Sequence, residues 1–436
     1  MNLILLSGGS GKRLWPLSND IRSKQFIKIF KKPDGGLESM AQRIYRQIKS
    51  VDPNATVTIA TSKSQVSAIH NQLGMDVGIS VEPCRRDTFA AIALATAYLH
   101  DVKRVPEDEA VVVCPVDPYV EEGYFKTLKS MCEAAQKGTE NLVLMGIEPT
   151  YPSEKYGYIK PIERDGQWSW GFTEKPTKEK ADEYIRNGAL WNGGVFAYKL
   201  SYVLNKSKEL LGTSNYDTLF STYDTLKKIS FDYAVVEQET SIEVIRYSGT
   251  WKDLGTWNTL TEAMEEQIIG DAVLNNECSN VHVINELGIP VLVMGGKDLV
   301  ISASPEGILV SDKEQSSYIK PFVDAIDQQI MFAEKSWGSY RVLDVEDDSM
   351  TIKLTLNPGH KMNYHSHEKR DEIWNVISGI GKTIVDGTEQ PVKPGDVITM
   401  SAGCKHTVVA GEDGLQLIEV QIGKDINVSD KYKSEF

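Results

Sequence analysis

The sequence predicts an α/β protein in which a Rossmann-like domain with a mixed, mostly parallel sheet precedes a strand-rich connector and a β-barrel. Three observations indicate this order. Apolar runs alternate with helical patterns over the first 150 residues, the helical patterns fade near residue 270, and short alternating strands with glycine turns follow residue 337. A chain of 436 residues is also too long for one ordinary core, so two or three domains are expected.

Five apolar runs in the first region are typical of buried strands: Asn2–Ser7, Thr56–Thr61, Val77–Pro83, Ala110–Asp117 and Leu142–Ile147. Helical patterns lie between them, with an amphipathic stretch from Met40 to Val51 and strong helix formers over Ala90–Leu99. This alternation predicts parallel strands covered by helices on both faces. Ligands of such sheets bind at the carboxyl ends of the strands.

The connector and the barrel are predicted from turn signals. Short apolar runs separated by turns indicate a few coils of parallel β-helix: Val281–Ile284, Pro290–Met294, Leu299–Ile301 and Ile308–Val310. Further on, Asp386-Gly387 predicts a tight hairpin and Pro394-Gly395 a type II turn, as in antiparallel barrels. We therefore expect domains over residues 1–265, 266–325 and 326–436.

Composition narrows the class of protein. The net charge of −14 argues against a nucleic-acid partner, which would need a concentrated basic face, but leaves room for a small anionic substrate. No apolar run reaches eighteen residues, so no membrane span is expected, and the start does not have the pattern of a signal peptide. Five scattered cysteines without a CxxC pair favour reduced thiols and a cytoplasmic protein.

The stretch LLSGGSGKRLWPLS, directly after the first predicted strand, is a candidate phosphate-binding loop. It is not a Walker A motif, because Leu6 and Arg13 occupy required Gly and Ser/Thr positions, nor a dinucleotide fingerprint, because Leu14 replaces a glycine. Its backbone N–H groups could approach oxygen anions closely, and two cations adjoin it. The candidate residues are Gly8, Gly9, Ser10, Gly11, Arg13 and Lys24. A plain flexible turn is the alternative, which the two cations disfavour.

This loop opens a series of motifs that resembles the sugar-phosphate nucleotidyltransferases, specifically the mannose-1-phosphate guanylyltransferases. The matching blocks keep the order of that family: GGSGKRLWPLS…SKQF, VEPCRRDTFAAIALA, CPVD, YGYI, FTEKP, WNGGVFAY, FDYAVVE and WKDLGTW. The resemblance implies that GTP, or another nucleoside triphosphate, reacts with a sugar 1-phosphate such as mannose 1-phosphate to give a nucleotide sugar and pyrophosphate.

Catalysis of this reaction depends on aligning two anions and neutralising their charge, so a divalent cation such as Mg²⁺ is expected. By resemblance, Asp117 and Asp253 are the Mg²⁺ ligands, and Arg13 and Lys24 hold the phosphates. The other implied positions face either the nucleoside (Glu82, Arg86, Asp87) or the sugar phosphate (Gly157, Glu174, Lys175, Asn192). The chain departs from the family at Ser23, Asp87, Pro118 and Gly193, so the base or sugar preference could have shifted.

Four of the seven histidines lie between His360 and His406, in the predicted barrel. A spaced quartet there resembles the metal site of the cupin barrels: His365, His367, Glu372 and His406. Three imidazoles and one carboxylate suit Zn²⁺ or another divalent transition metal.

The segments KSWGSY and RDEIW resemble the cupin domain that acts as mannose-6-phosphate isomerase in many such guanylyltransferases. Arg370 would then act on the substrate, which is mannose 6-phosphate or fructose 6-phosphate. His365 and Ala410 stand where that family has Gln and Asn. A bifunctional enzyme and a transferase whose cupin is only a binding or regulatory module therefore both remain open. We expect the protein to form a homodimer.

Overall fold

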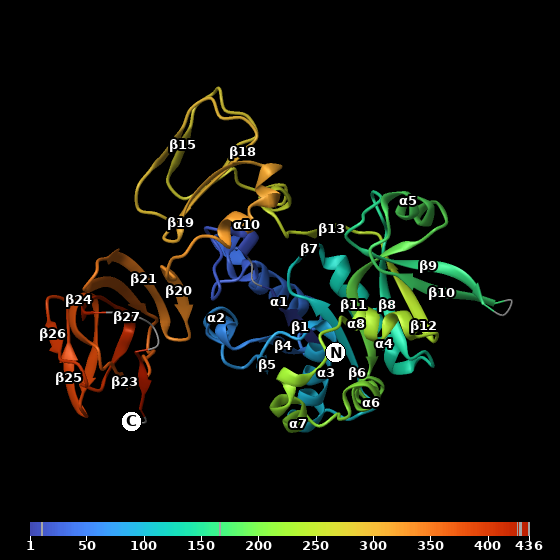
Figure 1. Cartoon of the computed structure of the whole chain (residues 1–436), viewed down its shortest axis with the longest axis horizontal. Coiled ribbons are helices and arrows are strands. Elements are labelled where there is room, and N and C mark those ends of the chain that lie inside the picture. Colours follow the sequence, from blue (N-terminus) through green and yellow to red (C-terminus); the bar gives the residue numbers. More distant parts are fainter. Residues whose placement is uncertain (10–11, 165–166, 425, 427–429, 435–436) are drawn as a thin grey trace.

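The computed structural model describes residues 1–9, 12–164, 167–424, 426 and 430–434. Three regions follow one another along the chain: an α/β region, a small stack of short strands and a C-terminal barrel (Figure 1). Among these described residues, no helix is both long and apolar enough to cross a membrane.

The α/β region is built on a mixed sheet whose central path runs β10-β9-β11-β6-β1-β4-β5. Its parallel strands are β1 (Asn2–Ser7), β4 (Thr56–Ser62), β5 (Gly78–Glu82) and β6 (Ala110–Pro115). The strands that join antiparallel are β9 (Gly157–Arg164), β10 (Gln167–Thr173) and β11 (Leu190–Lys199). The sheet also includes β8 (Leu142–Ile147), antiparallel to β11, and β12 (Ile242–Tyr247), parallel to β8. The expected mixed sheet is confirmed.

Hydrophobic cores cover both faces of this sheet, because the side chains of β1 alternate between them. Leu3 and Leu5 pack with the buried side of α1 (Met40–Val51), whereas Ile4 packs with α3 (Asp87–Ala97). The remaining helices of this region are α2 (Val66–Leu73), α4 (Glu122–Lys137), α5 (Lys178–Arg186), α6 (Leu200–Leu211), α7 (Tyr216–Ser221), α8 (Phe231–Ala234) and α9 (Trp257–Thr261).

Local sequence explains where α1 begins. Ser39 caps it by accepting from the backbone N–H of Gln42, whose side chain accepts in return from the N–H of Ser39. Ile44 and Ile48 then lie on one buried face. Ser39 also ends β3 (Leu37–Ser39), which pairs with β2 (Lys28–Lys31).

A short antiparallel pair of strands joins two parts of this region that are distant in the sequence. It consists of β7 (Pro118–Val120) and β13 (Trp251–Asp253), with Asp253 directly opposite Pro118. Asp117 immediately precedes Pro118. The ladder therefore brings two aspartates side by side that are far apart in the sequence.

The connector consists of short parallel ladders with one antiparallel strand at its end. One ladder contains β14 (Ile268–Ile269), β16 (His282–Asn285) and β18 (Leu299–Ser304), and the other contains β15 (Ala272–Leu274) and β17 (Val291–Val293). The antiparallel strand β19 (Gly307–Asp312) and the short helix α10 (Lys320–Val323) follow. Val281, Val283, Val293 and Ile301 fill the space between the ladders.

The barrel is antiparallel, as its turn signals predict. Its strands are β20 (Phe332–Lys335), β21 (Gly338–Val345), β22 (Ser349–Leu356), β23 (His365–Ser366), β24 (Arg370–Val385), β25 (Thr388–Val392), β26 (Val397–Met400), β27 (His406–Gly423) and β28 (Tyr432–Lys433). Asp386 and Gly387 join β24 to β25 with positive φ angles of 47° and 79°, as a type I′ turn requires. Gly395 has φ 94°, which suits the predicted type II turn.

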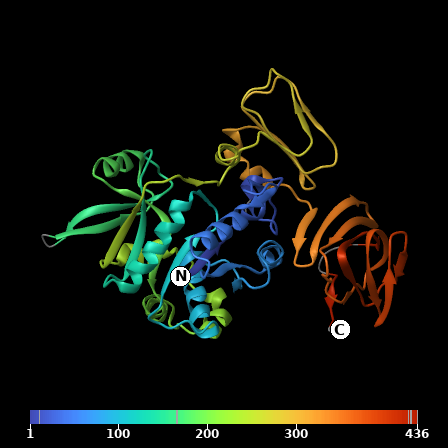
Figure 2. The same ribbon diagram turned by 180° about the vertical axis from the view of Figure 1, so that it is seen from behind.

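The segment after the glycine-rich loop contacts both other regions, and Figure 2 shows this N-terminal part on the side of the α/β region that faces the connector and the barrel. The guanidinium of Arg22 donates to both carboxylate oxygens of Glu286 in the connector at 2.8 Å. Asn19 donates to Glu306 at 2.8 Å. The same Glu306 oxygen accepts from two successive backbone amides at the start of β20, at 3.0 and 2.9 Å. One buried carboxylate thus ties three regions together.

Replacing Glu306 with alanine should destabilise this junction by about 3 kcal/mol, because three partly buried donors lose a charged acceptor. Thermal unfolding of E306A measures the loss, and E314A, which removes an exposed glutamate of the same region, is the control. A melting temperature of E306A equal to that of E314A would show that the junction does not depend on this carboxylate.

Candidate active site and metal centre

A cavity of about 750 Å³ opens at the carboxyl ends of the parallel strands β1, β4, β5 and β6, where ligands of such sheets bind. Several predicted site residues line it: Gly8, Gly9, Glu82, Asp87 and Asp117. Gly9 follows β1 with φ 121°, a conformation that glycine adopts without strain. Ser10 and Gly11, also predicted to bind phosphate, lie outside the described residues.

The charged centre of the site is Lys24. Its Nζ lies 2.7 Å from Asp117 Oδ2 and 3.6 Å from Asp253 Oδ1. Burial alone would lower the pKa of Lys24, but attraction by the two carboxylates outweighs it and the pKa is raised. Both aspartates therefore lie within reach of one cation, and each keeps part of its carboxylate exposed, 30% for Asp117 and 48% for Asp253.

Arg13 lies beside Asp253 and Lys24. A β-carbon built on Gly255 would lie 3.3 Å from Asp253 Oδ1 and 3.6 Å from Arg13 Nη1, so both groups flank one glycine. The Arg13 charge also opposes protonation of Lys24, which agrees with their closeness. The structure brings together Arg13, Lys24, Asp117 and Asp253, the four residues expected from the sequence. Two partly exposed carboxylates next to the cations Arg13 and Lys24 form a donor set that fits Mg²⁺.

The residues expected to face the nucleoside differ in their contacts. Glu82 accepts from the hydroxyl of Tyr223 at 2.8 Å, and burial raises its pKa. Asp87 begins α3 with φ 68°, a region that Asp and Asn tolerate. Of the neighbouring arginines, Arg85 lines the cavity, whereas Arg86 donates to the backbone carbonyl oxygens of residues 223 and 224. Arg86 thus holds the short 3-10 helix of residues 223–225.

The four residues expected to hold the sugar phosphate meet at one edge of the sheet. Gly157 pairs with Asn192 in the β9–β11 ladder. A β-carbon on Gly157 would lie 2.5 Å from Glu174 Oε2, so only glycine permits this approach. Lys175 pairs with Glu174 at 2.5 Å.

Asp232 joins this group and was not singled out as a site residue from the sequence, although it lies in the FDYAVVE block. It lines the cavity and accepts from Asn192 Nδ2 at 2.6 Å. Burial and repulsion by Glu174 raise the pKa of Asp232 to about 6. Asn192 therefore links the sugar-phosphate group to the cavity. Lys63 and Lys228 also line the cavity, and no sequence motif pointed to them.

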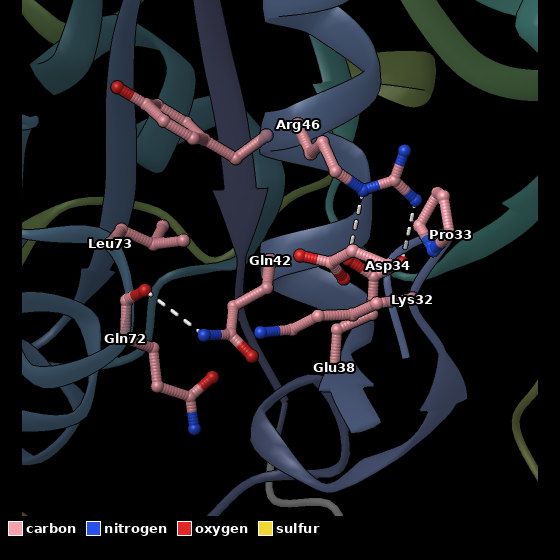
Figure 3. A pocket seen from close by; sticks show the side chains of 9 residues that line it. Lys32, Pro33, Asp34, Glu38, Gln42, Arg46, Gln72 and Leu73 are labelled. Carbon is pink, nitrogen blue, oxygen red and sulfur yellow. Dashed lines mark hydrogen bonds and ion pairs between the residues drawn. The ribbon is translucent and has the colours of Figure 1, made fainter. Parts of the chain in front are cut away.

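A smaller hollow of about 490 Å³ lies beside α1 and contains none of the predicted site residues. Figure 3 shows that its polar side chains face one another. Arg46 donates to both oxygens of Glu38, at 3.0 and 2.6 Å, and Gln42 donates to the backbone carbonyl of Gln72. We therefore assign the candidate site to the larger cavity.

The barrel encloses the predicted histidine cluster. One potential ligand atom each from His365, His367 and His406 lies within 4.8 Å of the others. The two oxygens of Glu372 lie 3.1 Å from His367 Nε2 and 3.1 Å from His406 Nε2. All four side chains are at most 3% exposed, so the predicted quartet comes together inside the barrel.

The hydrogen bonds of the imidazoles orient them as metal ligands. Each Nδ1 lies against a backbone carbonyl oxygen, of Asn363 for His365, of Asp430 for His367 and of Cys404 for His406. This arrangement places the proton on Nδ1, so each Nε2 carries a lone pair, and that of His367 accepts from Arg370 Nη2 at 3.1 Å.

The pKa values of the cluster also favour metal binding. Burial lowers the pKa of His365 to about 2 and of His367 to about 4, so both are neutral near pH 7. Burial opposes ionisation of Glu372, but the neighbouring groups, His406 first among them and Arg370 included, outweigh burial and lower the pKa of this carboxyl. Glu372 Oε2 and His406 Nε2 are buried without a hydrogen-bond partner. The cluster therefore fits a divalent transition metal.

Arg370 belongs to this cluster, since its Nε donates to Glu372 Oε1 at 3.1 Å. The sequence did not reveal Glu419, a buried carboxyl that accepts from Trp374 Nε1 at 3.0 Å. Burial and repulsion by Glu372 raise the pKa of Glu419 to about 7. Glu419 lies in β27 with no motif around it, so only the fold places it in the barrel.

Comparisons with known proteins cover the whole chain. Residues 2–268 match the nucleotidyl transferase family, and residues 325–435 match the mannose-6-phosphate isomerase C-terminal family. A putative mannose-1-phosphate guanylyltransferase of Vibrio cholerae is 28% identical over 99% of each chain. The mannose-1-phosphate guanylyltransferase of Escherichia coli K12 is 28% identical over 98% of this chain and 96% of its own. A solved structure from Thermus thermophilus, described as mannose-1-phosphate geranyltransferase, covers 74% of this chain and 98% of its own, with TM-score 0.61 and 28% identity.

The raised pKa of Asp232 predicts that the folded state loses stability as the pH rises. The folded-state pKa lies above the unfolded value of 3.8, so ionisation costs the folded state free energy as the pH rises through 4 to 6. D232N keeps the acceptor for Asn192 and removes the charge. It should raise the free energy of unfolding by about 2 kcal/mol at pH 7.5, with no gain below pH 4.

Urea denaturation at both pH values measures this difference, and D108N, at an exposed aspartate, is the control. An equal effect of D232N at the two pH values would be inconsistent with a buried, charge-penalised carboxyl.

Proposed function

The chain belongs to the nucleotidyl transferase family, and on this basis we propose that it converts GTP and mannose 1-phosphate into GDP-mannose and pyrophosphate. The resemblance found from the sequence motifs is confirmed by the family match and by relatives that cover nearly the full length. The observation that carries the proposal is the position of Lys24, which lies within ion-pair distance of both Asp117 and Asp253 beside the cavity.

In the proposed reaction, a phosphate oxygen of mannose 1-phosphate attacks the α-phosphorus of GTP. The bond from that phosphorus to the bridging oxygen of the β-phosphate breaks, and pyrophosphate leaves with the bonding electrons. Arg13 and Lys24 would neutralise the charge of the triphosphate, and the backbone at Gly8 and Gly9 would contact its oxygens. Asp117 and Asp253 would hold Mg²⁺, which when bound supplies further positive charge at the phosphates.

Other residues in the cavity and beside it would orient the two substrates. Glu82 and Asp87 lie on the side of β5 and α3, where we place the nucleoside. Glu174 and Asn192, beside Gly157, offer carboxylate and amide groups to the sugar hydroxyls. Lys175 would meet the sugar phosphate. Orientation of this kind lowers the activation free energy of a reaction between two bound groups by several kcal/mol.

For the barrel we propose interconversion of mannose 6-phosphate and fructose 6-phosphate. The observation that favours this second activity is the buried cluster of three imidazoles with Glu372. His365, His367, His406 and Glu372 would hold Zn²⁺ or a similar ion, which when bound polarises the oxygens of the sugar. A barrel that only binds a sugar phosphate is the alternative.

The five cysteines, all of them free, support a reducing cytoplasmic location. The homodimer stays a prediction.

Replacing either Asp117 or Asp253 with alanine should lower kcat for Mg²⁺-dependent pyrophosphate release from GTP and mannose 1-phosphate at least about a hundredfold. The control is D108A, at an exposed aspartate of the same region. Activity of D117A or D253A similar to that of D108A would refute the assigned roles. Turnover of the wild type with CTP or UTP but not with GTP would refute the assigned base.

His406→Ala should remove the barrel metal and abolish formation of fructose 6-phosphate. Elemental analysis gives the metal content per chain, and a coupled assay follows the sugar phosphate. H360A is the control, because His360 is an exposed histidine of the same barrel. Metal content of H406A equal to that of H360A would contradict the proposed site. Metal-loaded wild-type protein without isomerase activity would favour the binding role.

A further inference from the structure

Five polar side chains form a buried hydrogen-bond network beneath the glycine-rich loop. Their exposed fractions do not exceed 2%, and they come from the end of β1, the end of β4, the turn before α2 and the segment around Lys24. The five residues are Ser7, Ser23, Gln25, Thr61 and Gln65. None of them was a candidate site residue from the sequence.

The side-chain amide of Gln65 is the centre of this network. Its Oε1 accepts from Ser7 Oγ at 3.0 Å and from Thr61 Oγ1 at 2.8 Å. The same oxygen accepts from Gln25 Nε2 at 3.3 Å, and Gln65 Nε2 donates to Ser23 Oγ at 2.7 Å. Three donors around the oxygen and one acceptor at the nitrogen fix the orientation of the amide.

The network holds the chain on both sides of Lys24. Ser23 and Gln25 are its immediate neighbours, and both are bonded to Gln65. Gln25 Nε2 also donates to Ser7 Oγ at 2.9 Å. Since Ser7 ends β1, the segment that carries Lys24 is joined to the sheet edge where the cavity opens.

The network also reaches the glycine-rich loop itself. Ser23 Oγ donates to the backbone carbonyl of Gly9 at 3.4 Å. Ser23 stands at a position where the chain departs from the family it resembles, so this contact depends on a side chain particular to this sequence. A buried network of this kind is rigid, because movement would leave polar groups without partners.

We propose that Gln65 and Ser23 are positioning residues of the transferase, which set the Lys24 ammonium against Asp117 and Asp253 and hold Gly9 in place. The inference rests on the proposed function of this cavity. Gln65 lines the cavity, but its oxygen is already used by three internal donors, so it acts through Lys24 and not on the substrate. A misplacement of about 1 Å lowers the rate of a reaction that depends on alignment about a hundredfold.

The first test compares two serine-to-alanine variants with equally buried hydroxyls. S23A breaks the network, whereas S207A removes a hydroxyl that donates to the carbonyl of Val203 within α6. S23A should lower kcat about tenfold, with a change in melting temperature similar to that of S207A. The KM for mannose 1-phosphate should stay within about twofold of the wild type, because the residues expected to bind the sugar phosphate are unchanged. Equal kcat values for S23A and S207A would overturn the proposal.

Two further variants decide the case if S23A does not fold. T61V keeps the shape of the side chain and removes one donor to Gln65, and Gln65→Met removes the amide. Both should lower kcat, Gln65→Met more than T61V. Full activity of both variants would overturn the proposal.

Hydrogen exchange separates this inference from the proposed function. The backbone amides of residues 23–27 should exchange faster in S23A than in S207A, whether or not the wild type turns over GTP. Inactive wild-type protein would refute the proposed function alone. Unchanged exchange in this segment would refute the positioning role alone.

Discussion

The constraint on which the site depends is the short ladder between β7 and β13. It places Asp253 opposite Pro118 and therefore beside Asp117, although the two aspartates are far apart in the sequence. Two carboxylates this close repel each other unless a cation lies between them, and Lys24 provides that charge. The cavity, the glycine-rich loop and Arg13 all meet at this point. An arrangement of this kind suits a reaction between two polyanions, in which neutralised charge and fixed alignment supply most of the catalysis.

The segment that carries this charge is also where the three regions of the chain meet. On one side of Lys24, Arg22 forms two hydrogen bonds with Glu286 of the connector. On the other side, Gln25 belongs to the buried network around Gln65. Asn19 and Glu306 extend the contact to the first strand of the barrel. The segment that carries Lys24 is therefore held by the connector and the barrel as well as by the sheet that bears the cavity.

Periodicity and turn chemistry predicted the local structure because they are local properties. The strands Asn2–Ser7 and Leu142–Ile147, and the hairpin at Asp386-Gly387, are found at the predicted positions. Which side chain enters the cavity depends on long-range packing, so the sequence could not separate Arg85 from Arg86 or point to Lys63 and Gln65. The motif series pointed to Asp117, Asp253 and Lys24, but the pairing of Lys24 with both aspartates became visible only in the fold. In the barrel, the spacing of the histidines was enough to predict their cluster, whereas no motif surrounds Glu419.

The proposed reaction requires that Asp117 and Asp253 act as a pair on one divalent ion next to the bound nucleotide. Anomalous diffraction from crystals grown with Mn²⁺ and GDP-mannose tests this most directly, because Mn²⁺ substitutes for Mg²⁺ and is located independently of the protein. The account predicts one manganese peak in contact with both carboxylates and with the diphosphate. Bound nucleotide sugar with a manganese peak that contacts only one of the aspartates, or neither, would contradict it.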